Sequence, residues 1–468
     1  MATRCRSLQS VAAVLTAFAA GCTQSPSLTA PQVYVGRYPE GVSYQPFKNT
    51  SGADVTPDAT VCFPETSIYC PDTGATLKVV VPGPGDPANA FAGGTLVSGL
   101  PRNLSAFDAV TFWARSTREA PLVIGLGADQ SDNPLYIVLG GISLDTAWRQ
   151  YILPIPLPTR LTAEKGLFYF SAGADGSPAT GFTFWLANIQ YVTLGAAIDG
   201  PQPVLPAACI QKNVGDGAFP GFGGALTPIA YGVNAGIDVI GASSRYFTFT
   251  SSNTAVATID PAGSVSVKGN GTATVTAQLG GLTAAGPLTV KVGGNDTCPP
   301  IAVPTTIAPA PTVPAANVIS LFGSTYPVRP VDTWHTVWSA CCSDYTPTSI
   351  GSHPVKKYSL HPFNGVAISP DGSVTNAIDA SAMTFFHIDV WTPDGYAFDV
   401  KLVNDPTGFT SESTVRSYVL QTGTWTSLEI PMTAFRNLGS TSKIGQMLFL
   451  VPDGTSSTFY VDNVFFHN

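Results

Sequence analysis

The chain of 468 residues is long enough for about three domains, and its hydrophobic content of 44% can supply a core for each. Charged residues make up only 11%, and the formal net charge of -8 argues against a nucleic-acid backbone as partner, which needs clustered Lys and Arg. With 46 Gly, 40 Pro and no convincing amphipathic helix, the composition predicts an all-β, secreted protein rather than a helical cytosolic enzyme.

Residues 1–21 have the features of an export signal, because a basic start precedes an apolar run, 11–20, that is too short to span a bilayer. The run ends in A-A-G-C, which resembles a bacterial lipobox with Ala19 where Leu is more usual. The resemblance implies lipidation of Cys22 and display at the outer membrane or cell surface on a tether, 22–32. The alternative is an ordinary signal peptide cut nearby, which leaves Cys22 as a spare thiol.

Besides Cys5 in the signal and Cys22, six cysteines remain, and in an exported protein these favour disulfides. We expect Cys62 and Cys70 to close a short loop, and Cys209 and Cys298 to form a bond that brackets the middle domain. Cys341 and Cys342 are vicinal and either pair with each other or stay reduced. Because the sequence has no C-x-x-C pair, the cysteines do not predict a metal site.

Residues 33–198 contain short β-rich runs separated by turn residues, which is the pattern of an antiparallel sandwich. These runs are 76–81, 109–114, 122–126, 135–139, 148–155 and 182–191. The following residues, 199–225, are rich in Gly and Pro and predict a linker.

The middle segment, 226–293, contains a Ser-Ser-Asn turn, a V-A-T-I-D strand, a Gly turn and a G-T-A-T-V-T strand. These motifs resemble the bacterial immunoglobulin-like group 2 domain. The resemblance implies a small β-sandwich that serves as a spacer, although some such domains bind receptors. Residues 294–315 then place several prolines among Ala and Thr, which predicts an extended, semi-rigid linker.

The last segment, 316–468, holds all 5 His and four of the 7 Trp. Its stretch M-T-F-F-H-I-D-V-W-T, at 383–392, alternates as a strand does, so its side chains divide between two faces. One face is expected in the core and the other in a polar, aromatic-lined groove: Phe386, Ile388 and Val390 on the first, and His387, Asp389 and Trp391 on the second.

A glycan-binding groove needs flat aromatic faces for sugar rings and planar polar groups for hydroxyls, and the second face supplies both. We expect further contributions from a neighbouring strand, from a Ser- and Thr-rich loop and, in the first domain, from the equivalent face: Lys401; Trp334, Trp338 and Tyr345; and Trp113 with Arg115. The alternatives are that the loop aromatics cover the core, that Trp391 packs under a loop, and that His387 is a satisfied strand residue.

Three motifs of the first domain recur in the last one in the same order: 107–115 parallels 382–391, 148–154 parallels 425–431, and 185–191 parallels 460–466. The order resembles the galactose-binding-like jelly rolls used as carbohydrate-binding modules, and the last copy is similar to modules attached to laminarinase-type β-glucanases. The resemblance implies two jelly rolls flanking the immunoglobulin-like domain, and a polysaccharide, β-glucan-like, as partner.

In that fold the Asp of the closing strand often ligates a structural Ca²⁺, and Asp462 fills the position in the last domain, whereas the first domain has Ala187. The resemblance therefore implies calcium in the last domain only. The alternative is that Asp462 caps a turn or pairs with a neighbour. Nothing in the sequence predicts an organic cofactor.

The sequence contains few of the residue patterns that catalysis requires. The six Glu are scattered singly, and the chain lacks the E-x-D-x-x-E strand of laminarinases, a G-x-S-x-G elbow and an H-E-x-x-H pair. We therefore predict a non-catalytic, polysaccharide-binding surface lipoprotein with the last domain as its main binder. The alternatives are a structural or adhesive protein that binds protein neighbours and an enzyme of unrecognised type.

Overall fold

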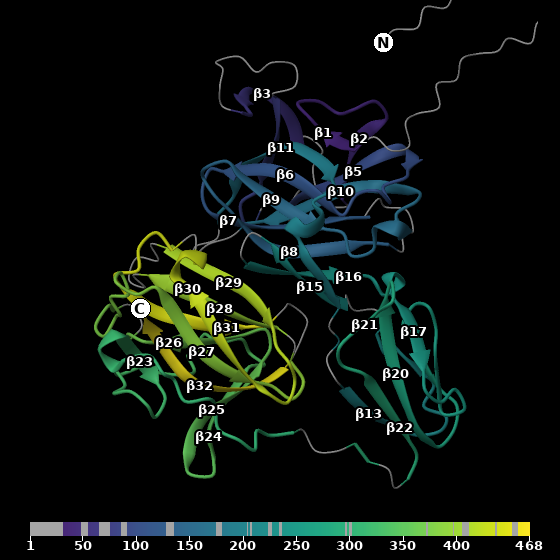
Figure 1. The fold of residues 1–468 in the computed structure, drawn as a ribbon. Helices are drawn as coiled ribbons and strands as arrows, with labels where there is room; N and C mark the ends of the chain where they lie inside the picture. The colour runs from purple at the N-terminus through teal and green to yellow at the C-terminus, as the bar shows by residue number, and fades with distance from the viewer. Residues whose placement is uncertain are drawn as a thin grey trace, which may run out of the picture.

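A computed structural model gives the fold, and Figure 1 shows it as a set of β-sandwiches. It describes residues 31–47, 55–64, 75–85, 91–127, 135–174, 180–203, 205, 208–222, 227–233, 236–294, 297–298, 302–370, 373–395, 397–404, 411–435, 438–451 and 457–468. The expected signal peptide, Cys22 and Cys70 lie outside these residues. The all-β fold predicted from the sequence is confirmed.

The N-terminal jelly roll consists of two packed sheets. The strand order of the first is β3-β4-β11-β6-β9, with β1 beside β11, and the second has the order β12-β15-β16-β8-β7-β10-β5-β2. The first sheet comprises β1 (Gln32–Tyr34), β3 (Val55–Cys62), β4 (Ala75–Val81), β6 (Ala109–Ser116), β9 (Arg149–Pro154) and β11 (Phe182–Val192). The second comprises β2 (Val42–Pro46), β5 (Phe91–Arg102), β7 (Ala120–Leu126), β8 (Ile137–Leu144), β10 (Glu164–Gly173), β12 (Asp199–Pro203), β15 (Thr227–Val233) and β16 (Gly236–Ala242).

The segment 199–225, expected to be a linker, contains strands. Its first strand, β12, pairs with β15, and the hairpin β15–β16 extends the second sheet of the jelly roll through β8. This hairpin was expected in the immunoglobulin-like domain, 226–293, but it pairs with the jelly roll, and its residues Ile229 and Ile240 are fully buried. The Gly and Pro content of 199–225 predicted a linker and did not reveal these short strands. They are stabilised by pairing with other strands and by burial, which composition does not show.

The immunoglobulin-like domain follows, with sheet orders β13-β22-β20-β17 and β14-β19-β18, and β21 beside β20. Its strands are β13 (Ala208–Lys212), β14 (Ala218–Phe219), β17 (Thr248–Ser251), β18 (Ala257–Ile259), β19 (Val265–Val267), β20 (Gly271–Leu279), β21 (Leu282–Thr283) and β22 (Leu288–Val292). The expected alternation in β20 is observed, since Ala273, Val275 and Ala277 are fully buried.

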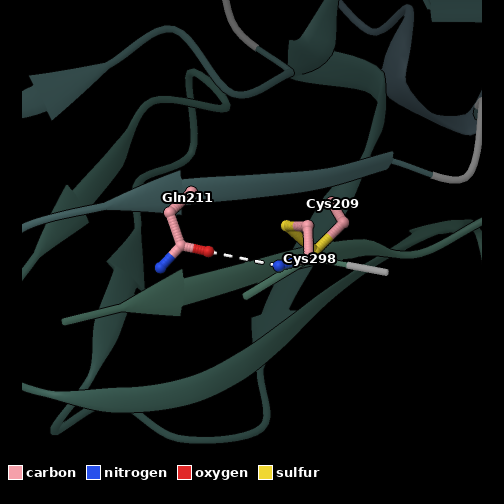
Figure 2. The surroundings of a disulfide bond; sticks show 3 residues. All are labelled: Cys209, Gln211 and Cys298. Carbon is pink, nitrogen blue, oxygen red and sulfur yellow. Dashed lines mark hydrogen bonds between the residues drawn. A yellow bond between two sulfur atoms is a disulfide. The ribbon is translucent and has the colours of Figure 1, made fainter. Parts of the chain in front are cut away.

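The expected disulfide between Cys209 and Cys298 ties β13 to the segment that leaves this domain (Figure 2). The backbone N–H of Cys298 donates to Oε1 of Gln211 on the same strand at 3.2 Å, which fixes the exit of the chain. Cys62 is also disulfide-bonded. In contrast, Cys341 and Cys342 are exposed free thiols whose Sγ atoms lie 3.2 Å apart, so the reduced alternative holds for the vicinal pair.

The C-terminal jelly roll has a six-stranded sheet of order β24-β25-β32-β27-β30, with β23 beside β32, and a second sheet of order β26-β31-β28-β29. The first comprises β23 (Val318–Phe322), β24 (Asp344–Ile350), β25 (His353–Leu360), β27 (Phe385–Trp391), β30 (Trp425–Pro431) and β32 (Ser457–His467). The second comprises β26 (Phe363–Ala367), β28 (Ala397–Asn404), β29 (Ser411–Val419) and β31 (Ile444–Leu450).

The two jelly rolls are structural repeats, as the sequence motifs predicted. Their first sheets share one strand order, in which β6, β9 and β11 correspond to β27, β30 and β32. Pairing sets the register: Trp113 lies opposite Ala187, and Asp389 lies opposite Asp462. Asn188 and Asn463 follow these partners and adopt the same positive φ, 51° and 47°. Residues can therefore be compared between the domains position by position.

Helical structure in the described residues is limited to single 3-10 turns: η2 (Pro158–Arg160), η3 (Gly195–Ala197), η4 (Ser244–Tyr246), η5 (Ala315–Asn317) and η6 (Met432–Ala434). None of the helices in this part of the chain has the length and apolar character needed to cross a membrane.

Candidate functional site

Strand β27 has the predicted two faces. Phe386, Ile388 and Val390 are fully buried in the core of the C-terminal jelly roll. On the outer face, however, His387 is 6% exposed, Asp389 1% and Trp391 5%. The expectation of an open groove on this face is therefore wrong for the conformation described, because the side chains meant to line it are covered.

His387 is held by carboxylates on two strands. Its Nδ1 lies 2.7 Å from Oε1 of Glu429 on β30, and its Nε2 lies 3.5 Å from Oδ2 of Asp389. The imidazole stacks on Phe465 with ring centres 4.3 Å apart, and the second oxygen of Glu429 lies 2.8 Å from Nε2 of His467. Burial lowers the pKa of His387, but the two carboxylates outweigh it and the pKa is raised above its usual value.

Asp389 and Trp391 have partners within the same domain. The Asp389 carboxylate accepts hydrogen bonds from the Ser427 hydroxyl and, at 2.7 Å, from Nδ2 of Asn463. Trp391 meets Tyr460 edge to face, with ring centres 5.5 Å apart, and packs with Val355. The outer face thus carries a network of polar groups and rings that mostly have partners, although Nε2 of His387 is buried without a hydrogen bond to any described residue.

The cover over this face is the Pro-rich linker itself. Nε1 of Trp425, the residue paired with Trp391, donates to the carbonyl oxygen of Thr306 at 2.7 Å. Nδ2 of Asn463, which also bonds Asp389, donates to the carbonyl oxygen of Pro309 at 3.0 Å. Ala308 lies between these contacts and is 5% exposed. The linker was expected to hold the C-terminal jelly roll away from the other domains. Instead, part of the linker lies against the C-terminal jelly roll.

Asp462 does not have the surroundings of a calcium ligand. Its Oδ2 lies 2.5 Å from Nε2 of His353, and its Oδ1 accepts the backbone N–H of Asn463 at 2.8 Å. Ca²⁺ takes oxygen ligands, and the described residues contain no group of three or more His, Cys, Asp or Glu side chains placed to hold a metal. Burial raises the pKa of Asp462, opposed by these hydrogen bonds. The residues at this position do not fit calcium.

Trp334 and Tyr345 surround a buried ammonium instead of forming a sugar platform. Nζ of Lys356 lies 4.1 Å from the ring centres of both Trp334 and Phe322, and 3.2 Å from the Tyr345 hydroxyl, to which it donates. Lys356 is only 7% exposed, and burial lowers its pKa to about 8. Tyr345 is part of β24 and not of a loop, and these aromatic residues therefore cover the edge of the core around the Lys356 ammonium.

Lys401 lies in the second sheet, and Trp338 lies in a turn that packs against that sheet. The Trp338 ring lies directly over Gly365 of β26, where any Cβ would collide with it. Gly365 pairs with Leu448, and Leu448 pairs with Lys401 on β28. The expectation that Lys401 joins Asp389 and Trp391 is wrong, because the chain crosses from one sheet to the other between β27 and β28.

The N-terminal jelly roll presents a different outer face on its six-stranded sheet. Trp113 and Arg115 on β6 are half-buried there, as are Trp148 just before β9 and Trp185 on β11. The guanidinium carbon of Arg115 lies 5.4 Å from the ring centre of Trp148 and 5.2 Å from that of Trp185. Phe63 adds a fourth ring.

This aromatic face is held together by ring contacts and one hydrogen bond. The Phe63 ring centre lies 4.8 Å from that of Trp113 and 5.1 Å from that of Trp148. Nε1 of Trp185 donates to Oδ2 of Asp58 on β3 at 3.0 Å. Burial raises the pKa of Asp58, but hydrogen bonds from Thr60 and Trp185 outweigh it and the pKa is lowered, which keeps the carboxylate charged.

Sequence reasoning identified Trp113 and Arg115 but missed Phe63, Trp148, Trp185 and Asp58. Alternation could have placed Trp185 on the outer face, because its neighbours Phe184 and Leu186 are fully buried in the core. The convergence itself depends on strand order, which joins β11 to both β4 and β6. The sequence alone does not give that order.

Comparison with known proteins gives the following similarities. The family model of the intimin immunoglobulin-like domain matches residues 242–280, which supports the immunoglobulin-like character of the middle domain. Among curated proteins, none matches the chain.

Several solved structures are similar to parts of the chain. One is a family 11 carbohydrate-binding module from Clostridium thermocellum in complex with a β-1,3-1,4-mixed-linked tetrasaccharide, with 17% identity over 27% of this chain and 82% of that one, and a TM-score of 0.22. A family 30 module has 16% identity over 35% and 98%, with a TM-score of 0.25. A family 29 module has 14% identity over 35% and 86%, with a TM-score of 0.22. Likeness at this level does not assign a function.

Proposed function

We propose that this chain binds a polysaccharide without catalysis, and that the aromatic face of the N-terminal jelly roll is its main binding surface. One observation carries the proposal: Phe63, Trp113, Trp148 and Trp185 gather half-buried on one outer sheet face, with Arg115 between two of the indoles. The sequence favoured the C-terminal domain as main binder, but there the equivalent face is covered.

The chemistry of the face suits sugars. Indole rings offer flat apolar surfaces for the apolar faces of pyranose rings, and stacking against them requires no charge on the ligand. Arg115 supplies several N–H donors held in place by two rings, and Asp58 supplies a carboxylate for hydroxyls. Because sugar hydroxyls are well hydrated, we expect modest affinity that rests on a few rings.

The finer parts of the proposal rest on the sequence motifs. The A-A-G-C sequence that ends at Cys22 supports export and a lipid anchor at the bacterial surface, and the resemblance to modules of laminarinase-type glucanases supports a β-glucan-like polymer. An anchored binder with no catalytic machinery would hold the polymer close to the cell.

Affinity electrophoresis of the full chain through gels that contain laminarin, xylan, mannan or a cellulose derivative tests this function. We expect retardation on at least one polymer, and an at least tenfold weaker interaction for Trp113→Ala and for Trp185→Ala, since a central aromatic contact contributes on the order of 2 kcal/mol. Tyr136→Ala is the matched control, because Tyr136 is 40% exposed in the same domain but lies outside the aromatic face.

Two results would overturn the proposal. Retardation that survives both tryptophan variants, and is lost in Trp338→Ala instead, would move the site to the second sheet of the C-terminal domain. Absence of retardation on every polymer, with circular dichroism showing a folded chain, would favour a structural or adhesive protein whose jelly rolls bind protein neighbours.

A further inference from the structure

The segment 302–313, hereafter the strap, lies along β27 in an ordered way. Its Thr306 carbonyl meets Trp425, which pairs with Trp391 at one end of the strand. Its Pro309 carbonyl meets Asn463, which bonds Asp389 in the middle.

The far end of the strap reaches the other end of the strand. The Val313 carbonyl accepts the Tyr326 hydroxyl at 2.6 Å, and Tyr326 packs edge to face on Phe465, with ring centres 5.4 Å apart. Phe465 in turn stacks on His387. The strap therefore follows, in order, the neighbours of the three side chains that the sequence singled out for a groove.

The strap is attached to the sheet by side-chain hydrogen bonds and not by strand pairing. Among the hydrogen bonds of the described residues, those that hold it run from side chains to its carbonyl oxygens, and no backbone–backbone bond joins it to the sheet. Prolines 304, 309 and 311 lack the N–H that strand pairing needs. Most strap residues are exposed, whereas Pro304 and Ala308 are buried and Pro311 and Val313 are half-buried.

The face beneath the strap offers the groups that a sugar polymer uses. An indole N–H and a carboxamide N–H point at acceptor oxygens of an extended chain, and the rings of Trp391, Trp425 and Tyr460 cluster around them. An extended Pro-rich chain and a β-linked polysaccharide are both elongated ribbons that present acceptor oxygens along their length. The strap occupies the face as such a ligand would.

We propose that the strap is a detachable, built-in occupant of a second polysaccharide-binding face, formed by the outer side of β27, β30 and β32. This inference rests on the proposed function of the chain as a polysaccharide binder. With the strap in place the face is closed. Release of the strap exposes Trp391 and Trp425 as stacking surfaces and frees the Trp425 and Asn463 donors for hydroxyl groups. The apparent affinity of this face is then set by the fraction of molecules with the strap released.

A matched pair of substitutions tests the strap. Ala308→Asp places a charge at the buried strap position, whereas Ala310→Asp places the same charge at an exposed position two residues away. Both are made in the full chain that carries Trp113→Ala, so that the N-terminal face contributes little. Proteinase K cleavage within 302–313, mapped by mass spectrometry, reports strap release, and affinity electrophoresis on the same four polymers reports binding.

We expect faster cleavage and at least about a tenfold gain in retardation for Ala308→Asp, with Ala310→Asp behaving as its parent. If Ala308→Asp does not speed cleavage, replacement of 302–313 by a Gly/Ser segment of equal length removes the strap contacts, and the gain must appear in that variant.

A released strap without gain, in a protein whose parent with an intact N-terminal face is retarded, would overturn the strap inference and leave the proposed function standing. Absence of retardation in every variant, including the chain with both faces intact, would overturn both. A gain in Ala310→Asp equal to that in Ala308→Asp would show an effect of charge and would also overturn the inference.

Discussion

The two jelly rolls share one strand order and differ in what covers the outer face of the six-stranded sheet. In the N-terminal copy, Trp113 and Arg115 stand half-buried beside further aromatic rings. In the C-terminal copy, the register-equivalent residues are Asp389 and Trp391, both buried, and the strap is bonded to their neighbours Asn463 and Trp425. One framework therefore supports an open aromatic surface and a closed polar network.

The difference shows that the fold and the binding surface are specified by different residues. The inward-facing residues of β6 and β27 are apolar and buried in both copies, and they secure the sandwich. The outward-facing residues do not contribute to that core, so they are free to form either a platform or an internal network. The comparison predicts that matched substitutions at equivalent outer positions have unequal effects.

The largest inequality is expected at the Asp389 position. Asp389→Ala removes a buried carboxylate that accepts hydrogen bonds from the Ser427 hydroxyl and from Nδ2 of Asn463, and we expect this loss to lower the free energy of unfolding of the C-terminal domain by about 3 kcal/mol. Trp113→Ala, at the equivalent half-buried position, should cost about 1 kcal/mol. Denaturant-dependent hydrogen exchange, read separately in β32 and β11, measures both values. Equal costs would mean that the two faces are built alike.

The positive-φ asparagines provide the next comparison. Gly accepts a positive φ without strain, so Asn188→Gly should change stability by less than about 0.5 kcal/mol. Asn463→Gly keeps the backbone compatible but removes the bonds to Asp389 and Pro309, and should cost about 2 kcal/mol. The same exchange measurement applies. A small effect of Asn463→Gly would indicate that its side-chain bonds contribute little to the closed face.

Lys356 should make the stability of the C-terminal jelly roll depend on pH in the neutral to alkaline range, unlike that of the N-terminal jelly roll. Its register equivalent is Leu77, which is fully buried, whereas burial of Lys356 lowers its pKa to about 8. Between about pH 8 and about pH 10, the unfolded chain holds a proton that the folded chain has lost, so stability rises with pH. Lys356→Leu should remove this rise without loss of stability at pH 7. An unchanged pH profile in the variant, compared by thermal unfolding, would contradict the assignment.

His387 should give the smallest effect, with the opposite sign. Its raised pKa means that the folded domain binds the proton more tightly than the unfolded chain does. The resulting stability is fully present below the usual pKa of about 6.5 and is lost as pH rises through the folded value. Glu429, Asp389 and the nearby His467 lie in the same network of polar contacts, so the test is the difference between the parent and His387→Thr, which copies Thr111. If the stability of His387→Thr depends on pH with the same slope as that of the parent, the raised pKa of His387 is refuted.

The sequence predicted the strands and the core side of β27 because alternation is a local signal. It did not predict that His387, Asp389 and Trp391 are covered, because the cover comes from residues 302–313, whose composition indicates only an extended chain. A polyproline-like segment carries no local mark of the surface on which it lies. The burial of this face is therefore a tertiary property.

Two further differences have the same origin. Lys401 follows β27 closely in sequence, but successive strands of a jelly roll cross between sheets, so sequence proximity did not mean a shared face. The aromatic face of the N-terminal domain is assembled from four segments, and Phe63, Trp148 and Trp185 are adjacent only through strand order. The residue types were visible in the sequence, whereas their convergence was not.

Hydrogen exchange of the full chain with and without the polysaccharide that retards it tests the central claim most directly. We expect protection on binding in β3, β6, β9 and β11 of the N-terminal jelly roll, with no change in β27, β30 and β32 while the strap is in place. Protection confined to the C-terminal strands, with the N-terminal aromatic face unchanged, would contradict the account.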